Sequence, residues 1–327
     1  MISKSIDYSQ ISLVPNFSTI KSRSELSTEL DFLGHKFKNP AVPANMACTI
    51  NLYLAKELSQ SGYFYIMHRF LSYDEIFNWI RSNQNLQTIS ISVGVKEKDF
   101  KLIKRLYDAD LRVDFITIDI AHGWHISVKE TIEYIKAYSR GHFYPKIIAG
   151  NVMTDEATED LIFWGADAVK IGLSQGKGCS TYNTTGVGRP MFSTILDCST
   201  TGYPIIADGG IREIGDVCKA LVAGANMVMI GSEFCMCKDS PADIQELNYG
   251  EEIGQKLSKK LKVYYGSASA KNKGYNKYVE GFEVRLPMKD ETYFEYLHRI
   301  EQGIQSCMSY NGSNNISNLK NMRYIIK

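Results

Sequence analysis

The sequence has no long apolar run. It contains no stretch of about 18 or more consecutive apolar residues, the length that a membrane-spanning helix needs. Its first residues, Met1 to Tyr8, also lack the basic-then-apolar order of a secretory signal peptide. We therefore expect no membrane association and a location in the cytoplasm.

A disulfide framework is also missing. The seven cysteines are odd in number and scattered along the chain, which fits a protein of a reducing compartment better than a disulfide-bonded secreted protein. Cys235 and Cys237 are separated by a single residue and have no partner pair, so their spacing does not predict a zinc site.

Neither sign of charge is in excess. The chain carries 37 Lys and Arg against 36 Asp and Glu, a formal net charge of +1. This balance excludes a general nucleic-acid or polyanion binder but leaves a local anion site open. With 327 residues, 44% of them hydrophobic, the composition is that of a globular protein of one large or two small domains.

What the sequence does contain is a repeated alternation of short apolar runs and helical segments. The runs are rich in β-branched residues, and several end in Gly, Asn or Asp; they cover 41–45, 64–68, 89–94, 115–120, 146–151, 168–173, 204–209 and 227–232. Segments with helical spacing lie between them at 52–61, 73–83, 97–108, 128–137, 155–164 and 215–223. Eight such runs predict an α/β fold, a (β/α)8 TIM barrel, with 1–327 as a single domain. A doubly wound open sheet is the alternative, but it more commonly has about six strands.

The region after the eighth run has a different character. Residues 256–287 are rich in Lys, Tyr, Gly and Asn, which predicts a long loop or active-site flap. A helix is expected to follow at about 291–308.

Polar residues gather where the predicted strands end, which is where active sites of this fold lie. The ends carry Asn45, His68, Arg69, Gly94, Asp119, Asn151, the Cys179 loop, Asp208, Gly209, Gly210, Gly231 and Ser232. Their clustering at one end of the barrel predicts an enzyme.

The ends of the seventh and eighth runs predict a phosphate site. Asp208-Gly-Gly210 and Gly231-Ser232 follow neighbouring strands, and glycines let backbone N–H groups approach phosphate oxygens. The alternative is that these glycines only make tight turns. The pattern indicates a phosphate without naming its carrier, and a flavin phosphate fits equally well.

A Gly-rich loop between Gly172 and Gly188 carries Cys179 and Thr181. Such a loop is suited to presenting a thiol nucleophile, although a surface loop with a spectator cysteine has the same pattern. Asp119 and His122 follow the fourth run, and Glu280 in the predicted flap is a candidate acid or base.

Taken together, the motifs resemble those of the IMP dehydrogenase/GMP reductase family. They run in the expected order along nearly the whole chain: Val42-Pro-Ala-Asn-Met46, Tyr65-Ile-Met-His-Arg-Phe70, Ile91-Ser-Val-Gly-Val95, Ile118-Asp-Ile-Ala-His-Gly123, Ile148-Ala-Gly-Asn-Val152, Gly165-Ala-Asp-Ala168, Cys179-x-Thr181 with Thr185-Gly186, Ala207-Asp-Gly-Gly-Ile-Arg212, Tyr265-Gly-Ser-Ala-Ser269 and Val279-Glu-Gly281. The resemblance implies the same barrel fold.

Two absences favour the reductases of this family over its dehydrogenases. The dehydrogenases usually carry a large insertion between the second and third strands, whereas here His68 and Ile89 are 21 positions apart. They also carry an Arg-Tyr pair in the flap, and none occurs in 270–285. The resemblance thus implies NADPH-dependent conversion of GMP to IMP, part of purine nucleotide salvage, in which the Cys179 thiolate attacks purine C2 and ammonia leaves.

The resemblance also implies roles for individual residues. Thr181 and Glu280 correspond to the pair that moves protons for the leaving amine. Substrate contacts are expected from Asp208, Gly209, Gly210, Gly231, Ser232, Tyr265, Gly266, Ser267 and Lys277, and cofactor contacts from Asp119, Asn151, Arg69 and His122. A homotetramer is expected.

The nucleophile loop departs from the family pattern. Ser174 and Gln175 stand where relatives have Gly and Pro, and Gly178 replaces an apolar residue. In the wider family the carbonyls of this loop bind a monovalent cation such as K⁺, so Gly172 and Cys179 mark a candidate cation site that these replacements put in question.

Several functions stay open at this point. One is an oxidoreductase acting on another purine nucleotide, such as dGMP, and another is an IMP dehydrogenase with an unusual flap. A flavin-dependent barrel oxidoreductase and a non-catalytic nucleotide-binding barrel are further alternatives.

Overall fold

The computed structural model of this chain describes residues 5–252, 255–266, 269 and 281–327. Seven parallel strands form one curved sheet in the order β4-β10-β9-β8-β7-β6-β5. Their bounds are β4 (Ala41–Pro43), β5 (Ser90–Val93), β6 (Phe115–Asp119), β7 (Lys146–Val152), β8 (Ala168–Ile171), β9 (Ile205–Asp208) and β10 (Met227–Ile230).

The segment 64–68 takes the eighth strand position of the barrel and lies beside β5. It was predicted as a full strand, but only Met67 forms a parallel bridge, to Ile91. The Met67 N–H donates to Ser90 O at 3.1 Å, and the Ser92 N–H donates to Met67 O at 2.9 Å. The fold is therefore the predicted TIM barrel of α/β class.

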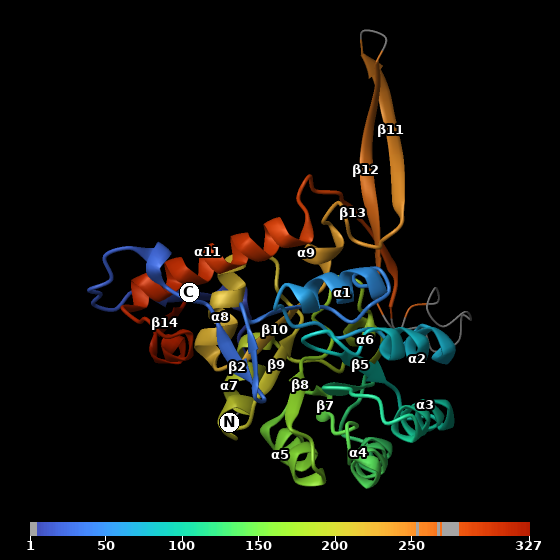
Figure 1. The fold of residues 1–327 in the computed structure, drawn as a ribbon. Coiled ribbons are helices and arrows are strands. Elements are labelled where there is room, and N and C mark those ends of the chain that lie inside the picture. The colour runs from blue at the N-terminus through green and yellow to red at the C-terminus, as the bar shows by residue number, and fades with distance from the viewer. Residues whose placement is uncertain (1–4, 253–254, 267–268, 270–280) are drawn as a thin grey trace.

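Helices follow the strands around the outside of the sheet (Figure 1). They are α1 (Leu52–Gln60), α2 (Tyr73–Ser82), α3 (Glu97–Asp108), α4 (Ile126–Tyr138), α5 (Asp155–Trp164), α6 (Thr181–Thr185), α7 (Met191–Ser199), α8 (Ile214–Ala223), α9 (Ser232–Cys235) and α11 (Tyr293–Asn311). The sequence reasoning did not identify α7, and α11 corresponds to the helix expected at 291–308. Within the described part of the chain, no helix combines the length and the apolarity that a bilayer crossing requires.

Local sequence fixes where several of these helices begin. The side chains of Asn51, Ser72, Thr154 and Thr292 each accept a hydrogen bond from a backbone N–H in the first turn. Such a cap satisfies one of the N–H groups that a helix start leaves unpaired and stabilises it by about 1 kcal/mol.

The two-residue period of the strands divides the core into two layers. In β6, Phe115 packs inside the barrel, whereas Ile116 and Ile118 pack outward against the helices. In β8, Ala168 likewise faces inward and Val169 outward. The same alternation must turn Asp119 and Lys170 inward, because each lies an even number of positions from an inward neighbour.

The amino-terminal end of the barrel is filled by an aromatic plug. A hairpin of β2 (Leu30–Phe32) and β3 (His35–Phe37) brings Phe32 and Phe37 against Phe64, at ring-centroid distances of 5.6 and 4.9 Å. Phe64 in turn contacts Phe115 at 5.0 Å. This apolar floor leaves the opposite end of the barrel for polar chemistry.

The chain ends meet in a small antiparallel sheet outside the barrel. Strand β1 (Ile11–Val14) pairs with β14 (Arg323–Ile326). Short 3₁₀ helices lie at η1 (Tyr8–Gln10), η2 (Arg23–Glu25) and η3 (Ile316–Asn321).

Part of the predicted flap is a sheet instead of a loop. Strands β11 (Ile244–Glu252), β12 (Gln255–Tyr265) and β13 (Glu283–Pro287) form an antiparallel sheet in that order. Figure 1 shows β11 and β12 rising as a long ribbon beyond the rest of the chain. The prediction of a loop was wrong for 256–265 and 283–287 because lysines dominate this strand sequence and obscure its alternation. The remainder, 267–268 and 270–280, lies outside the described residues.

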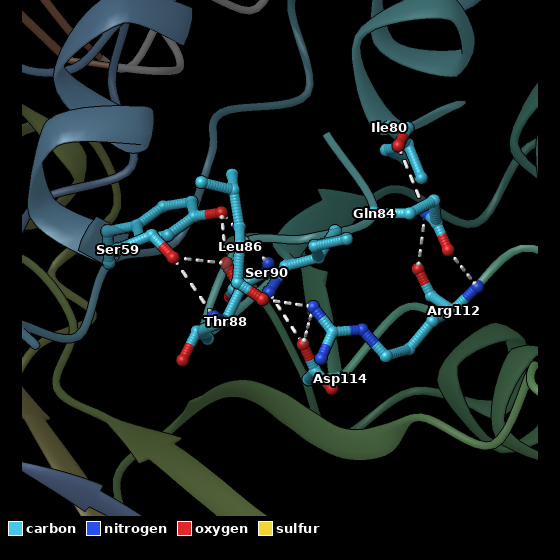
Figure 2. A network of polar contacts seen from close by, with 10 residues as sticks. Ser59, Ile80, Gln84, Leu86, Thr88, Ser90, Arg112 and Asp114 are labelled. Carbon is cyan, nitrogen blue, oxygen red and sulfur yellow. Dashed lines mark hydrogen bonds and ion pairs between the residues drawn. The ribbon is translucent and has the colours of Figure 1, made fainter. Parts of the chain in front are cut away.

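A buried polar network closes the sheet at the segment 64–68 (Figure 2). The Tyr65 hydroxyl donates to Thr88 O at 3.0 Å and accepts from Ser90 N at 3.3 Å. Asp114 accepts from Ile89 N at 2.7 Å, and Arg112 donates to Leu86 O. Burial raises the pKa of Tyr65, so the hydroxyl keeps the proton it donates.

We predict that Tyr65→Phe destabilises the fold by about 1–3 kcal/mol, because the buried Ser90 N–H loses the hydroxyl that accepts from it and the Thr88 carbonyl loses one donor while keeping the Ser59 hydroxyl. The midpoint of urea unfolding should fall. The matched control is Tyr144→Phe, at a side chain that is 68% exposed, where the midpoint should stay unchanged. Equal midpoints for the two variants would contradict the role given to Tyr65.

Candidate active site

A cavity of about 450 Å³ opens at the carboxyl ends of the barrel strands. Its volume lies within the usual range for small-molecule sites. The predicted site residues that line it are Arg69, Asp119, Asn151, Gly172, Cys179, Thr181, Asp208, Gly209 and Gly266. Residues from five ends, those of 64–68, β6, β7, β8 and β9, therefore meet at one site with Gly266 at the end of β12, as the barrel topology predicts.

The nucleophile loop is a tight turn held from both sides. The Cys179 N–H donates to Gly176 O at 3.0 Å, which closes the turn. The Phe282 N–H donates to Gly178 O at 3.1 Å, and Cys179 pairs with Gly281 across this contact. The loop is thereby pinned against the start of β13.

Cys179 differs from every other cysteine in its exposure. All seven cysteines lie in the described residues; Cys179 is partly exposed, and the other six are buried. Burial raises the pKa of Cys198 to about 11 and that of Cys237 to about 12, which keeps them as unreactive thiols. The Cys179 thiol lies 3.3 Å from the Thr181 hydroxyl, so the two predicted catalytic residues are in contact.

A buried lysine that the sequence reasoning missed organises the cavity floor. Lys170 Nζ lies 2.6 Å from Asp208 Oδ2 and 3.1 Å from Asp119 Oδ1, and its side chain is 3% exposed. The signal was available: a lysine inside the apolar run Ala168-Val-Lys-Ile171 must face inward with Ala168. A charge placed there needs partners of the opposite sign.

Charge pairing outweighs burial at this cluster. Burial alone would raise the pKa of Asp119, but the positive charges of Lys170 and Arg69 lower it below its usual range. Burial alone would lower the pKa of Lys170, but Asp208 and Asp119 raise it. Asp119 and Lys170 are therefore both charged at neutral pH.

Asn151 connects this cluster to the nucleophile loop. Its Nδ2 donates to Asp208 Oδ2 at 2.9 Å and to Gly172 O at 2.7 Å. A side chain added at Gly150 would meet Lys170 O at 2.4 Å, so only glycine lets β7 approach β8 this closely. The carboxylate, the amide and the loop are thus held as one unit.

A buried donor on the cavity wall lacks a hydrogen bond. Arg69 Nε has no hydrogen-bond acceptor among the described residues, and its ion pair with Asp119 Oδ2 is long, at 3.7 Å. A buried donor without an acceptor is costly, so Arg69 Nε favours a polar ligand at this wall.

A glycine-lined recess adjoins the cavity beside the ends of β9 and β10. Gly209, Gly210, Gly231 and Ser232 line it, together with Gln175, Lys177 and Arg212. Gly209 and Gly210 have φ of +107° and +79°, a left-handed backbone that glycine adopts without strain. The predicted phosphate-binding residues therefore do come together.

Tyr264, the neighbour of the predicted Tyr265, lies close to this recess. A Cβ added at Gly231 would lie 2.6 Å from the Tyr264 hydroxyl. Neither tyrosine is among the residues that line the two cavities, and the Tyr265 carbonyl accepts from the Cys48 thiol at 3.3 Å. Strand alternation could have separated the two tyrosines had β12 been recognised as a strand.

Other predicted residues are not brought to the cavity by the described structure. His122 is exposed and lines neither cavity. Ser267, Lys277 and Glu280 lie outside the described residues; Gly281, which follows Glu280 in the chain, pairs with Cys179.

Three carbonyls of the nucleophile loop already accept protein hydrogen bonds. Gly172 O accepts from Asn151, Gly176 O from Cys179 and Gly178 O from Phe282, so in this arrangement they point at protein donors. The monovalent-cation site stays a prediction. The described residues also hold no group of three or more His, Cys, Asp or Glu arranged for a metal ion. We derive no catalytic step through a cation.

We predict that Lys170→Gln destabilises the fold by about 3–5 kcal/mol at pH 8, because two buried carboxylates lose their cation. In the wild type, the lowered Asp119 pKa contributes stability that is constant above about pH 5. In the variant, burial raises that pKa, and a raised carboxyl pKa contributes stability that is lost as pH rises. The loss in Tm should therefore be smaller at pH 5 than at pH 8.

The matched control is Lys146→Gln, on the neighbouring strand, whose pair with Asp167 at 3.2 Å is 39% and 30% exposed. Its Tm should change little at either pH. An equal loss of Tm at pH 5 and pH 8 for Lys170→Gln would show that the carboxylates do not depend on Lys170.

The chain matches known proteins over nearly its whole length. The model of the IMP dehydrogenase / GMP reductase domain matches residues 5–327. GMP reductase of Oenococcus oeni is 43% identical over 98% of this chain and 96% of its own length, and that of Mesoplasma florum is 43% identical over 98% and 97%. GMP reductase of Staphylococcus aureus is 41% identical over 99% and 96%. The chain is similar to these enzymes from end to end.

Proposed function

Since the chain belongs to the IMP dehydrogenase/GMP reductase family, we propose that it catalyses the NADPH-dependent reductive deamination of GMP to IMP. One observation carries the proposal: Cys179, the partly exposed cysteine, contacts Thr181 in a cavity that adjoins a glycine-lined anion recess. This arrangement supports a nucleotide substrate, because a nucleophile lies near a recess that would hold the phosphate.

The reaction balances as GMP, NADPH and two protons giving IMP, NADP⁺ and ammonium. A bond forms between Cys179 Sγ and purine C2, and the C2–N bond to the amino group breaks. A nicotinamide cofactor held by Arg69, Asp119 and Asn151 would supply the hydride that reduces C2. The C–S bond then breaks, and IMP leaves with the thiolate restored.

Thr181 and Glu280 are the proposed proton carriers for the departing amine. The Thr181 hydroxyl is in contact with the Cys179 thiol, so it lies beside the carbon that the sulfur attacks. Glu280 lies outside the described residues, and its role is proposed from the sequence motif Val279-Glu-Gly281. Together they would protonate the amine as the C2–N bond breaks.

Asp208 is the proposed ligand of the ribose hydroxyls. Its Oδ2 is occupied by Lys170 and Asn151, which fixes the carboxylate plane and turns Oδ1 toward other donors. Gly209, Gly210, Gly231 and Ser232 would hold the phosphate. Tyr265, Gly266, Ser267 and Lys277 remain proposed substrate contacts from the sequence motifs.

The wall formed by Arg69, Asp119 and Asn151 fits a nicotinamide. The buried Arg69 Nε lacks a protein acceptor, and a carboxamide oxygen is a suitable one. Asp119 keeps Arg69 on this wall through their 3.7 Å contact. His122 is a proposed contact to the outer part of the cofactor.

The test of the proposed function is the absorbance of NADPH. The wild type should consume NADPH with GMP and should produce none from IMP with NAD⁺. Cys179→Ser should lower kcat at least a thousandfold, because the weaker hydroxyl nucleophile cannot form the thioimidate. Turnover of Cys179→Ser near the wild-type rate would overturn the covalent mechanism.

The matched control is Cys198→Ala, at a buried cysteine of α7 whose raised pKa makes it inert. It should keep wild-type kcat. If dGMP or another purine nucleotide were consumed much faster than GMP, the chemistry would stand and the substrate would change. A flavin absorbance band in the purified protein would instead indicate the alternative flavin enzyme.

We also propose that the enzyme is a homotetramer. Light scattering with size-exclusion chromatography would measure this directly, and a monomer mass near 36.9 kDa would contradict it.

A further inference from the structure

A groove on the outside of the barrel carries three sulfur atoms. It has a volume of about 550 Å³ and lies where α8, α11 and the end of η3 meet (Figure 1). Cys218 of α8, Cys307 of α11 and Met322, the residue after η3, all line it. None of its lining residues lines the active-site cavity or the glycine-lined recess, and the proposed reaction uses none of them.

Close packing of two helices brings the two thiols together. A Cβ added at Gly303 of α11 would lie 2.2 Å from Cγ2 of Ile214, so this glycine lets α11 approach α8. Cys307 and Cys218 each lie one helical turn beyond these two positions and therefore on the same faces of their helices. The thiols consequently hydrogen-bond to each other.

The third sulfur belongs to Met322. The Cys307 thiol donates to Met322 Sδ at 3.8 Å, so a lone pair of the thioether faces this thiol. Sulfur atoms that share one metal at about 2.3 Å lie about 3.8–4.0 Å from each other. The observed separation therefore already suits a common metal ion.

The donor set favours one kind of metal. Two thiols and a thioether are soft ligands, which select Cu(I). Structural zinc takes four ligands, and the part of the chain that the structure describes has no cluster of three or more His, Cys, Asp or Glu that would supply them. Calcium and magnesium require oxygen ligands, which this groove does not gather.

The two thiols differ in how readily they ionise. The hydrogen bond from Cys218 lowers the pKa of the Cys307 thiol and raises the pKa of Cys218 itself. Cys307 therefore offers the first thiolate to a metal. Two thiolates with Cu⁺ carry a net charge of −1, which lies beside Lys219 and Lys327 in the groove; Asp216 pairs with Lys219 at 3.1 Å but does not line the groove.

We propose that Cys218, Cys307 and Met322 bind one Cu(I) ion through their three sulfur atoms. Two Cu–thiolate bonds and one Cu–thioether bond form, the two S–H bonds break, and two protons pass to the solvent. No electron is transferred, because the copper enters as Cu(I). The bound ion joins α8, α11 and the segment after η3.

A second pair of thiols in the same chain serves as an internal comparison. Cys48 and Cys235 also hydrogen-bond to each other, but both are 0% exposed. Cys218 and Cys307 are 5% and 8% exposed and line a groove that a metal ion enters. If contact between two thiols were sufficient for binding, both pairs would take copper, whereas the proposal assigns it to the pair in the groove.

The first test is an anaerobic titration with Cu(I) in competition with bicinchoninate, a chromophoric Cu(I) chelator. It uses the full-length Cys179→Ser variant, which lacks the exposed active-site thiol. This protein should bind one Cu(I) per chain. Adding Cys307→Ala should weaken binding by about a hundredfold or more, and Met322→Leu by about tenfold. The matched control is Cys235→Ala, which should keep the affinity of its parent, and equal affinities for Cys307→Ala and Cys235→Ala would overturn the proposal.

The ligand shell is tested without any change to the two cysteines, so the result does not depend on the folding of Cys307→Ala. X-ray absorption at the copper edge of the Cys179→Ser protein should show three sulfur neighbours at about 2.3 Å. The Met322→Leu variant should show two. A shell of nitrogen or oxygen atoms, or an unchanged sulfur count in Met322→Leu, would contradict the assigned ligands.

The last test uses the wild-type protein and identifies the thiols that copper protects. Alkylation by N-ethylmaleimide is followed for each cysteine by peptide mass spectrometry, with and without one equivalent of Cu(I). Alkylation of Cys218 and Cys307 should slow by about tenfold or more, because a metal-bound thiolate is not free to attack. The rate at Cys179 should stay within about twofold. Protection of Cys179 without protection of the pair would refute the site, and neither outcome depends on turnover of GMP.

Discussion

The ion pairs of Lys170 with Asp119 and Asp208 are the interactions on which the rest of the site depends. A buried ammonium is tolerated because two carboxylates pair with it, and each carboxylate also contacts a further group of the site. Asp208 holds Asn151, Asn151 holds Gly172 O, and Gly172 begins the nucleophile loop. The ion pairs at the bottom of the cavity thus fix the position of the nucleophile loop.

The barrel explains why such a cluster forms at all. Period-two alternation sends every second residue of β6, β8 and β9 into the interior, and the aromatic plug fills the amino-terminal half of that space. Inward residues near the carboxyl ends have no apolar partners left, so charges there must pair with one another or with a ligand. The fold therefore concentrates chemistry at one end without any dedicated domain.

Much of this was predictable from local patterns, and the remainder required tertiary information. The alternation of apolar runs and helices predicted the barrel, and the strand ends predicted Asp119, Asn151, Cys179 and Asp208. Lys170 was missed because it lies inside an apolar run, and only residues at the strand ends were considered as site candidates. The position of Tyr264 beside Gly231 could be predicted only by recognising β12 as a strand, and the lysines of β12 conceal its alternation.

The replacements in the nucleophile loop make physical sense as a set. Ser174 has a φ of +71°, a left-handed backbone that costs a residue with a side chain about 1–2 kcal/mol relative to glycine. Its hydroxyl donates to Val187 O at 2.7 Å, and Gln175 Nε2 donates to Arg189 O at 3.0 Å. These bonds tie the start of the loop to 187–189 and offset the strain. Hydrogen bonds of the Ser174 and Gln175 side chains therefore hold the start of this loop in place.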